Sequence, residues 1–485
     1  MDVGWLGMRA KPRKSCPNCR RLQALVDDLE ARLKMLEATV ASLQEQLAAA
    51  RKDSSTSSKP PSSDIVKPPK PALPEGRDRR HIGGQPGHPK HERDAFPREL
   101  INGDSVDHRL DLCPCCGLDL QPLPTIVPRV IQQVDINDVP LEIQEHRVHP
   151  GWCSHCQKQF SAPLPIRIER GGLVGPRLTT LIAYLKGVCH ASFSTIRKFI
   201  RDVVGLTISR GQLANIIAKV SAALQQTYEE LRRSLPDEKR LNVDETGHKQ
   251  NRLRQWTWCF RADLYTLFKI DPTRSGDVLI EVLGKEFNGV LGCDYFSAYR
   301  RHQREFNVTL QFCLAHLIRD VKFLTTLPDA EARQYGTRLR EALRALFGVI
   351  HRSEQLTAEQ LQNQLEAARA EVLRCAASDV PTTNHCRNLA KRFETHGADY
   401  FRFITTAGVE PTNNLAEQAI RFVVIDRLIT QGTRSDKGNR WCERIWTVIA
   451  TCTQQGRSVF EFLESAVKAW FAGTEPPMLL PEVRD

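Results

Sequence analysis

The sequence predicts an α/β protein whose strand-rich core follows several small N-terminal modules. Short apolar strands with one helical pattern among them occupy residues 240–313, and helical patterns rich in Ala, Leu, Glu and Arg cover 314–400 and 412–475. The N-terminal third instead carries a heptad repeat and paired cysteines. The length of 485 residues suggests about three domains at roughly 150 residues each. With 41% hydrophobic residues, the chain can bury sizeable cores.

The composition excludes several classes of protein. Lys+Arg 68 exceed Asp+Glu 57 by 11, and this excess favours an anionic partner without separating nucleic acid from a membrane surface. No run of about 18 apolar residues predicts a membrane span, and the first residues lack the apolar core of a secretory signal. Six of the 15 cysteines form three Cys-x-x-Cys pairs, which indicates metal sites and free thiols instead of a disulfide framework.

Residues 1–51 form an N-terminal segment with an unbroken heptad repeat over residues 22–47. Its apolar positions are Leu22, Val26, Leu29, Leu33, Leu36, Val40, Leu43 and Leu47. A strict 3.5-residue repeat keeps one stripe of a helix facing a partner, so the pattern predicts a coiled coil and a homodimer or higher oligomer. An amphipathic helix packed on its own domain is the alternative.

Residues 52–107 read as a basic linker rich in Pro, Ser and Gly. Most of these residues lie in Ser54–Asp64, Lys67–Pro71 and Gly83–His88. A segment so poor in apolar residues does not bury a core. Whether it also contacts phosphate backbones stays open.

Residues 108–165 hold the strongest metal signal, two Cys-x-x-Cys pairs. The four cysteines are Cys113, Cys116, Cys153 and Cys156. Two such turns offer four thiolates to one Zn²⁺ in a closed tetrahedral site, which would be structural. The stretch between the pairs alternates apolar and polar residues from Leu141, so we expect a strand hairpin there, as in a zinc ribbon.

Two further sets of cysteines are less informative. Cys16 and Cys19 form a lone pair beside the heptad repeat, where two chains could share one metal ion. Two free thiols at that position are an equal alternative. Cys115 lies inside the first zinc pair and is expected to be a bystander.

The region 166–235 is helical in pattern and contains an order typical of a helix-turn-helix. Phe193–Val204 predicts a first helix, Gly205–Ile208 a turn, and Ser209 the cap of a second helix. The apolar face of the first helix would hold Ile196, Phe199, Ile200 and Val203. The outward residues of the second helix, which would enter a major groove of DNA, are Arg210, Gln212, Asn215 and Lys219. An ordinary helical hairpin is the alternative.

Three carboxylates in the following region suggest a catalytic metal site. The expected elements are strands at Arg240–Glu245, Gln255–Ala262, Leu264–Asp271, Gly289–Asp294 and Thr309–Cys313, with a helix at Asp277–Phe287. Asp244 and Asp294 stand at the ends of two strands, and Glu417 lies near the start of a later helix. If they converge, they suit two Mg²⁺ or Mn²⁺ ions, which prefer oxygen ligands and promote phosphodiester displacement.

Each of these acids also has a plainer interpretation. Asp244 ends a strand beside a competing Glu245, and Asp294 caps a turn. Glu417 completes a capping box if Asn414 is the N-cap of its helix. The tryptophans at 256 and 258 alternate along one strand, and we expect them to be core residues.

Several motifs then occur in one order along nearly the whole chain. They are Ser57–Asp64 (SSKPPSSD), Gly83–His88 (GGQPGH), the two zinc-type cysteine pairs, Val243–Gly247 (VDETG), Trp256 with Trp258, Ala315–His316, and Pro411–Arg421 (PTNNLAEQAIR). In this order they resemble transposases of the insertion sequence 66 family. The chain departs from the family pattern at His248, Leu314 and Gln418, and none of these changes removes a carboxylate.

The resemblance implies a DDE transposase with a ribonuclease H-like core over 236–454. A helical insertion would cover 314–405, and a C-terminal segment 455–485. Asp244, Asp294 and Glu417 would be the catalytic residues and the ligands of two Mg²⁺ or Mn²⁺ ions. The enzyme would cut the ends of its element and join the freed 3′-hydroxyl to target DNA.

The resemblance also implies the partners of the chain. These are DNA at the inverted repeats and in the target, and small accessory proteins of the element, with no membrane, in the bacterial cytoplasm at the nucleoid. His316 and Arg319 match a family motif. His316 is either a contact for the scissile phosphate or for Glu417, or a satisfied core histidine. A zinc-dependent DNA-binding regulator with a dead core and a DNA-bridging protein are the alternatives, and the three retained acids argue against the regulator.

Overall fold

The computed structural model describes residues 16–53, 56, 95, 97–100, 115, 141–146, 150–153, 155, 158–161 and 163–480. It is a mixed α/β structure, mostly helical, with one five-stranded sheet. Contacts divide the chain into two compact units, and the described residues of the smaller one are 95, 97–100, 115, 141–146 and 199–207. Among the helices of the described ranges, none combines the length and apolar content that a membrane span requires.

A single long helix, α1 (Pro17–Ala50), covers the heptad region. All eight heptad positions are exposed in the single chain, with side chains from 45% to 64% accessible. A stripe of exposed Leu and Val on an isolated helix is what a coiled-coil seam leaves when its partner is absent. The predicted helix is therefore confirmed, and its pairing stays a prediction.

The region predicted to bind zinc lies largely outside the described residues, including Cys113, Cys116 and Cys156. The strands β1 (Pro150–Cys153) and β2 (Lys158–Ser161) form an antiparallel hairpin that pairs Cys153 with Lys158. The expected strand is absent over residues 141–146, which have no regular structure and where Ile143 is 88% exposed. Most of the remaining stretch between the cysteine pairs lies outside the described residues, so the hairpin expected there stays a prediction.

A helical region precedes the sheet. Its elements are α2 (Ile166–Gly171), α3 (Pro176–Gly187), α4 (Phe193–Phe199), the π-helical turn η3 (Ile200–Val204), α5 (Arg210–Ala223) and α6 (Gln225–Ser234). Ser209 caps α5 in a capping box with Gln212, as its sequence position predicts. The prediction that Val203 belongs to the buried face of the first helix is wrong. Val203 is exposed, and Val204 is buried instead. A π-helical turn adds a residue and so rotates the face by one position.

The sheet has the strand order β5-β4-β3-β6-β7. Its strands are β3 (Arg240–Gln250), β4 (Leu253–Arg261), β5 (Thr266–Asp271), β6 (Val290–Cys293) and β7 (Thr309–Phe312). The first three pair antiparallel, whereas β3, β6 and β7 run parallel. All five strands appear where the sequence predicts them. The helix α7 (Asp277–Leu283) was also predicted, whereas α8 (Ser297–Phe306) was not.

The first strand is longer than expected. We predicted that it ends near Asp244, but β3 continues to Gln250 because its antiparallel pairing with β4 outlasts its parallel pairing with β6. A tight turn at Asn251 and Arg252, both with positive φ, closes this hairpin. Asp244 therefore lies within β3, at the point where its parallel neighbour ends.

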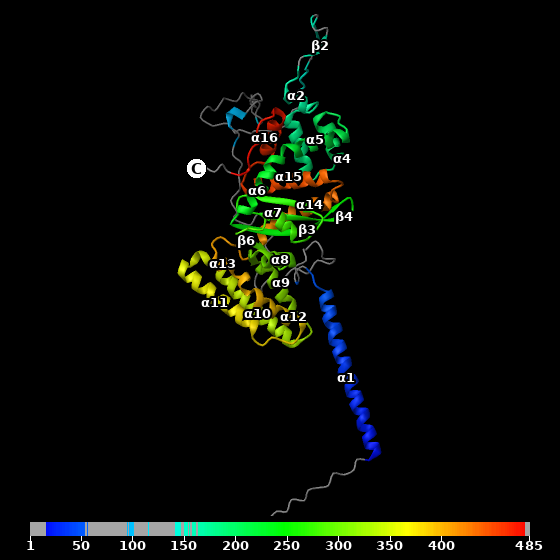
Figure 1. The fold of residues 1–485 in the computed structure, drawn as a ribbon, viewed down its shortest axis with the longest axis vertical. Helices are drawn as coiled ribbons and strands as arrows, with labels where there is room; N and C mark the ends of the chain where they lie inside the picture. The colour runs from blue at the N-terminus through cyan, green and yellow to red at the C-terminus, as the bar shows by residue number, and fades with distance from the viewer. Residues whose placement is uncertain are drawn as a thin grey trace, which may run out of the picture. The chain divides into compact units, whose positions relative to one another are not determined.

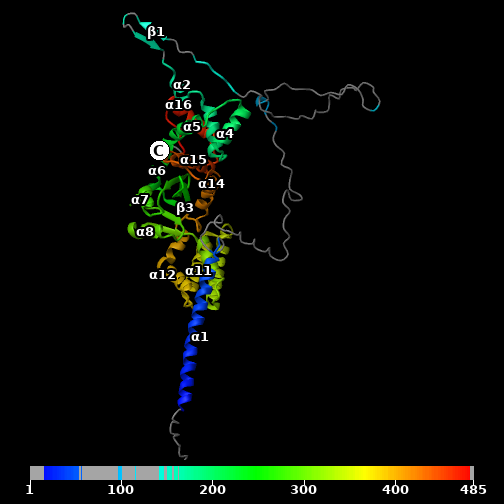
Figure 2. The same cartoon turned by 90° about the vertical axis from the view of Figure 1, so that its right-hand side faces the viewer.

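Two groups of helices follow the sheet. The first comprises α9 (Leu314–Leu324), α10 (Ala330–Ile350), α11 (Ala358–Ala377), α12 (Asn384–His396), the 3-10 turn η6 (Gly397–Tyr400) and α13 (Arg402–Thr405). The second comprises α14 (Asn414–Thr430), α15 (Asp436–Gln454) and α16 (Val459–Ala472). The helices α10, α11 and α12 pack on one another away from the sheet (Figure 1 and Figure 2). In contrast, α14 packs on β3 and β4, and α15 packs on β5.

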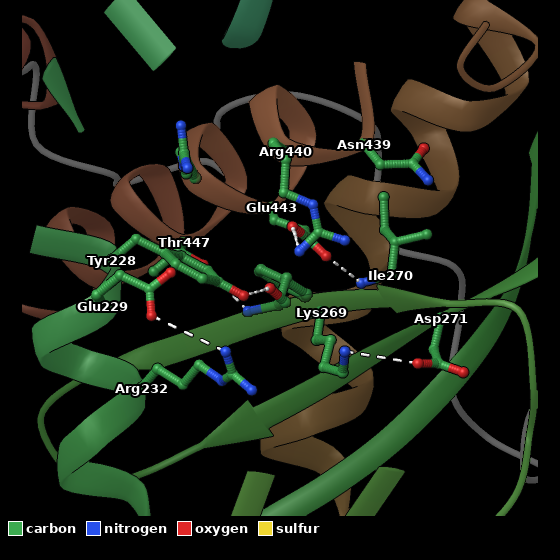
Figure 3. Close-up of polar contacts among 12 residues, drawn as sticks. Tyr228, Glu229, Arg232, Lys269, Ile270, Asp271, Asn439, Arg440, Glu443 and Thr447 are labelled. Carbon is green, nitrogen blue, oxygen red and sulfur yellow. Dashed lines mark hydrogen bonds and ion pairs between the residues drawn. The ribbon is translucent and has the colours of Figure 1, made fainter. Parts of the chain in front are cut away.

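The edge strand β5 is closed by side chains of α15 (Figure 3). The backbone N–H groups of Thr266, Phe268 and Ile270 donate to Thr451 Oγ1 (3.2 Å), Thr447 Oγ1 (3.0 Å) and Glu443 Oε1 (2.7 Å). Four helical residues rise about 6 Å and two strand residues about 6.6 Å, so the two ladders match. The helix thus does for β5 what a sixth strand would do.

Candidate active site

The candidate site lies at the carboxyl ends of the three parallel strands. Asn242 of β3 pairs with Gly292 of β6, so two residues further on both strands the register brings Asp244 level with Asp294. Asp294 follows β6 directly, and its Oδ1 accepts a hydrogen bond of 2.9 Å from the Phe296 amide. Because side chains alternate along strands, residues in register share one face.

The start of α14 is attached to these strand ends through Asn413. Its Nδ2 donates to Val243 O (2.8 Å), and its Oδ1 accepts from Asn242 Nδ2 (3.0 Å). Its backbone N–H donates to Cys313 Sγ (3.1 Å), at the end of β7. Asn413 is 1% exposed, so these bonds are made away from water. They place Glu417, one turn further into α14, beside β3 and β7.

The capping-box interpretation of Glu417 is wrong. The N-cap of α14 is Asn413 instead of Asn414, and no side chain caps this helix end. Glu417 donates its own backbone N–H to Asn413 O (3.2 Å). Its carboxylate is therefore available for other partners.

The three acids interact electrostatically. Burial raises the pKa of Asp244 well above its usual range, and the charges of Glu245, Asp294 and Glu417 raise it further. Burial also raises the pKa of Asp294, against the opposing effects of the Phe296 amide and of Arg274 and Arg392. Crowded carboxylates that repel one another are stabilised by a bound cation. This donor set of oxygens alone fits Mg²⁺ or Mn²⁺.

Glu245 does not compete for this role, because its side chain has other partners. It accepts a hydrogen bond of 2.6 Å from Arg274 Nε and another from the Tyr299 hydroxyl. The carboxylate is fully buried. Burial and the Asp294 charge raise its pKa, while Arg274 and Tyr299 act in the opposite direction.

His316 and Arg319, on α9, both face Glu417. His316 Nδ1 lies 3.7 Å from Glu417 Oε1, and Arg319 Nη2 lies 3.8 Å from Glu417 Oε2. Burial, together with the charges of Arg319 and Arg392, lowers the pKa of His316 to about 4. The imidazole is therefore neutral near pH 7. Of the roles considered for His316, the structure supports proximity to the third carboxylate, because the two atoms lie closer than 4 Å without forming a hydrogen bond.

A basic pocket lies next to this site and was not predicted. Its volume is about 410 Å³, and it is lined by Arg274, Ser275, Gly276, Ser297, Ala298, Arg300, Arg301 and Arg304. Arg274 connects it to the acids, because the same guanidinium pairs with Glu245. The arginine spacing in Tyr299–Arg304 was visible in the sequence, but its meaning depended on the unpredicted α8.

Trp256 and Trp258 have different environments. Trp258 is fully buried, as expected for a core residue. Trp256, also expected in the core, is only half-buried and has two cations near its ring, with Arg254 at 4.7 Å and Arg274 at 4.9 Å from the ring centroid. Of these two cations, Arg274 also lines the basic pocket.

His248, where the chain departs from the family pattern, has a structural role. It is buried, shares a hydrogen bond of 3.3 Å with Thr433 Oγ1, and packs edge-on against Trp446. Burial lowers its pKa to about 4. A neutral, enclosed imidazole at this position leaves the three acids undisturbed.

The residues proposed to read DNA on α5 are partly engaged within the chain. Arg210 donates to Ser194 Oγ (2.7 Å), Gln212 bonds the Ser209 amide (2.9 Å), and Lys219 donates to the carbonyls of Arg170 and Gly171. Asn215 is exposed. Lys219 thus fastens α5 to the end of α2.

Comparisons with known proteins were made along the chain. A family model described as Transposase IS66 family matches residues 171–440. A model described as a family of unknown function (DUF6444) matches residues 9–94. Among curated proteins the comparison found no match.

Proposed function

Because the chain belongs to the Transposase IS66 family, we propose that it cuts DNA at the ends of an insertion element and joins the freed ends to target DNA. Membership of the family makes it a DNA-acting transposase. The proposal adds the reaction: hydrolysis of a phosphodiester at each element end, followed by attack of the resulting 3′-hydroxyl on a target phosphodiester.

The observation that carries this proposal is the convergence of Asp244, Asp294 and Glu417. They come from β3, the end of β6 and the first turns of α14, and the Asp244 carboxyl is affected by the charges of both others. The strand order, with β4 antiparallel and a long helical segment before α14, is the arrangement expected of a ribonuclease H-like core. It supports a DDE assignment of the three acids.

We assign the three acids as ligands of two Mg²⁺ or Mn²⁺ ions. When bound, such a pair of ions lowers the pKa of an attacking water and stabilises the oxygens that enter and leave the phosphorus. Asp244, on the central strand β3, would serve both ions, and Asp294 and Glu417 would serve one each. Asn413 and Arg319 hold Glu417 in position. Because His316 is neutral, it does not compensate the negative charge of Glu417.

The basic pocket beside the acids is our candidate for the DNA backbone. Arginine guanidinium groups bind phosphate oxygens in a planar, bidentate geometry. Arg304 is exposed, and Arg300 lies over the Tyr295 ring at 4.3 Å; neither forms an ion pair with an acid among the described residues. Asn215 and Arg210 on α5, and the zinc cysteines of the N-terminal region, are proposed to contribute to end recognition. The exposed seam of α1 is proposed to bring two chains together.

The test is a mobilisation assay with a marker between the flanking repeats. Wild-type chain is compared with Glu417→Gln, which removes the charge and keeps the shape, and with Glu410→Gln, the same change at an exposed position. Binding to an end fragment is measured in parallel. We expect wild type and Glu410→Gln to mobilise the marker, and Glu417→Gln to bind ends without mobilising it. Equal mobilisation by all three would refute the site.

A further inference from the structure

We propose that Cys313, His316 and Glu417 form a binding site for a transition-metal ion, Zn²⁺ in the first instance. This site differs in its ligands from the Mg²⁺ or Mn²⁺ site proposed above, and shares only Glu417 with it. The binding claim stands on the geometry alone. Its consequence for catalysis rests on the proposed function.

The three side chains already surround one point. A ligand atom of each, the Cys313 Sγ, a His316 ring nitrogen and a Glu417 oxygen, lies within 4.8 Å of the other two. From Zn–S and Zn–N bond lengths, tetrahedral ligand atoms lie about 3.3 to 3.6 Å apart. The observed 3.7 Å between His316 Nδ1 and Glu417 Oε1 is close to that spacing. Small side-chain rotations would complete the site.

Two of these ligand atoms have no hydrogen-bond partner in the described structure. His316 Nδ1 and Glu417 Oε1 are both buried and unpaired. His316 as a whole is 7% exposed, so water does not readily serve it. Leaving buried polar atoms without partners is costly, and native proteins seldom do so without reason. A cation between the two atoms would satisfy both.

The backbone around Cys313 favours a thiolate ligand. Its Sγ accepts a hydrogen bond of 3.1 Å from the Asn413 amide. Cys313 also occupies the N-cap of α9, where the helix dipole stabilises a thiolate. On binding, the thiol proton passes to solvent.

Charged side chains of both signs surround the three proposed ligands. Arg319 lies 3.8 Å from Glu417 Oε2, and Arg392 pairs with Asp320 (2.8 Å). On the other side, Asp244 and Asp294 add negative charge. Arg319 faces Oε2, which leaves Oε1 for the ion.

The ligand set selects the metal. Thiolate and imidazole bind Zn²⁺ and its neighbours, whereas Mg²⁺ takes oxygen ligands and keeps much of its water. Three protein ligands leave a fourth position for water. Since Glu417 is common to both sites, we expect Zn²⁺ to compete with the catalytic ions and to inhibit DNA cleavage.

The test uses Co²⁺ as a spectroscopic substitute for Zn²⁺ on the full-length chain, with zinc at the N-terminal cysteine pairs left in place. Thiolate–cobalt charge-transfer absorption is followed during titration of wild type, Cys313→Ser, His316→Gln and Glu417→Gln. Cys189→Ser, at an exposed free cysteine, is the matched control. Thermal unfolding confirms that each variant is folded.

We expect wild type and Cys189→Ser to bind one more equivalent than Cys313→Ser. His316→Gln and Glu417→Gln should bind it roughly ten-fold or more weakly, since losing even a supporting residue of a metal site typically costs 10–100-fold. Identical titrations of wild type and Cys313→Ser overturn the site. Unchanged affinity in Glu417→Gln overturns the three-ligand arrangement.

The metal site and the proposed function fail separately. Co²⁺ absorption does not depend on DNA cleavage, so an inactive chain still tests the site. An active chain in which Zn²⁺ binds at Cys313 without slowing Mg²⁺-dependent cleavage would contradict the predicted competition.

Discussion

The sheet edge at β5 and the carboxyl ends of the parallel strands β3 and β6 contrast in how they treat buried polar groups. At β5, three backbone N–H groups find acceptors on α15. The second oxygen of Glu443 makes no hydrogen bond, but it forms an ion pair of 2.7 Å with Arg440. At the carboxyl ends of β3 and β6, by contrast, Asp244, Asp294 and Glu417 crowd together, and buried atoms of His316 and Glu417 have no partner.

This difference separates the residues that stabilise the fold from those that are expected to act. Satisfied polar groups add to stability, whereas crowded acids and unpaired atoms lower it unless a ligand compensates. We therefore interpret the β5 edge as structural support, and the carboxyl ends of β3 and β6 as a site that is completed by binding. The predictions below test that division.

The largest effect is expected for Asp244→Asn. Cleavage should fall by at least roughly 10³-fold because a metal ligand is lost. The free energy of unfolding measured without metal should stay equal or rise, since the repulsion between acids is removed. Denaturant titration with a cleavage assay checks both. Asp379→Asn, an exposed acid on the far helical segment, should change neither. A lower free energy of unfolding in Asp244→Asn would contradict the proposed difference between the β5 edge and the carboxyl ends of β3 and β6.

The opposite result is expected at the β5 edge. Thr447→Val keeps the shape but removes the acceptor of the Phe268 N–H, which leaves a buried donor unpaired. The free energy of unfolding should fall by about 1–3 kcal/mol. Thr453→Val is the control, because Thr453 is exposed and bonds only within its own helix. If cleavage per folded molecule drops in Thr447→Val while stability does not, the edge is not merely structural.

Glu443 gives this edge a pH dependence. Burial raises its pKa from 4.5 to about 7. The folded chain thus holds this proton more tightly than the unfolded chain, so the stabilisation is complete below about pH 4.5 and is lost as pH rises through about 7. The loss is at most about 1.4 kcal/mol per pH unit. Unfolding of wild type at pH 6 and pH 8 should differ more than that of Glu443→Gln. An equal change in the free energy of unfolding with pH in wild type and Glu443→Gln would contradict this prediction.

The smallest effect is expected in the basic pocket. Arg304→Ala should weaken binding to any DNA sequence equally and reduce the slope of log affinity against log salt by about 1. Arg344→Ala, an exposed arginine on α10, should leave the slope unchanged. Equal slopes for both variants would show that the pocket does not contact the backbone.

The sequence located the strands well because each is a short apolar run between turn signals, as at Gly289–Asp294. It placed Asp294 and Glu417 near element ends from position alone, whereas Asp244 lies within β3, where only its parallel neighbour ends. It missed the roles of Asn413 and Cys313, because these arise from contacts between segments 100 or more residues apart. It missed the basic pocket because the helix α8 that lines it was not predicted. The one-residue error at Val203 had a local cause, a π-helical turn that no periodicity rule anticipates.

The most direct test of the central claim is end cleavage by purified chain. A labelled end fragment is incubated with wild type or Asp294→Asn, with and without Mg²⁺ or Mn²⁺, and binding is measured on the same samples. We predict that wild type cuts only with the metal, and that Asp294→Asn binds equally but does not cut. Cleavage by Asp294→Asn at the wild-type rate would contradict the assignment of the three acids.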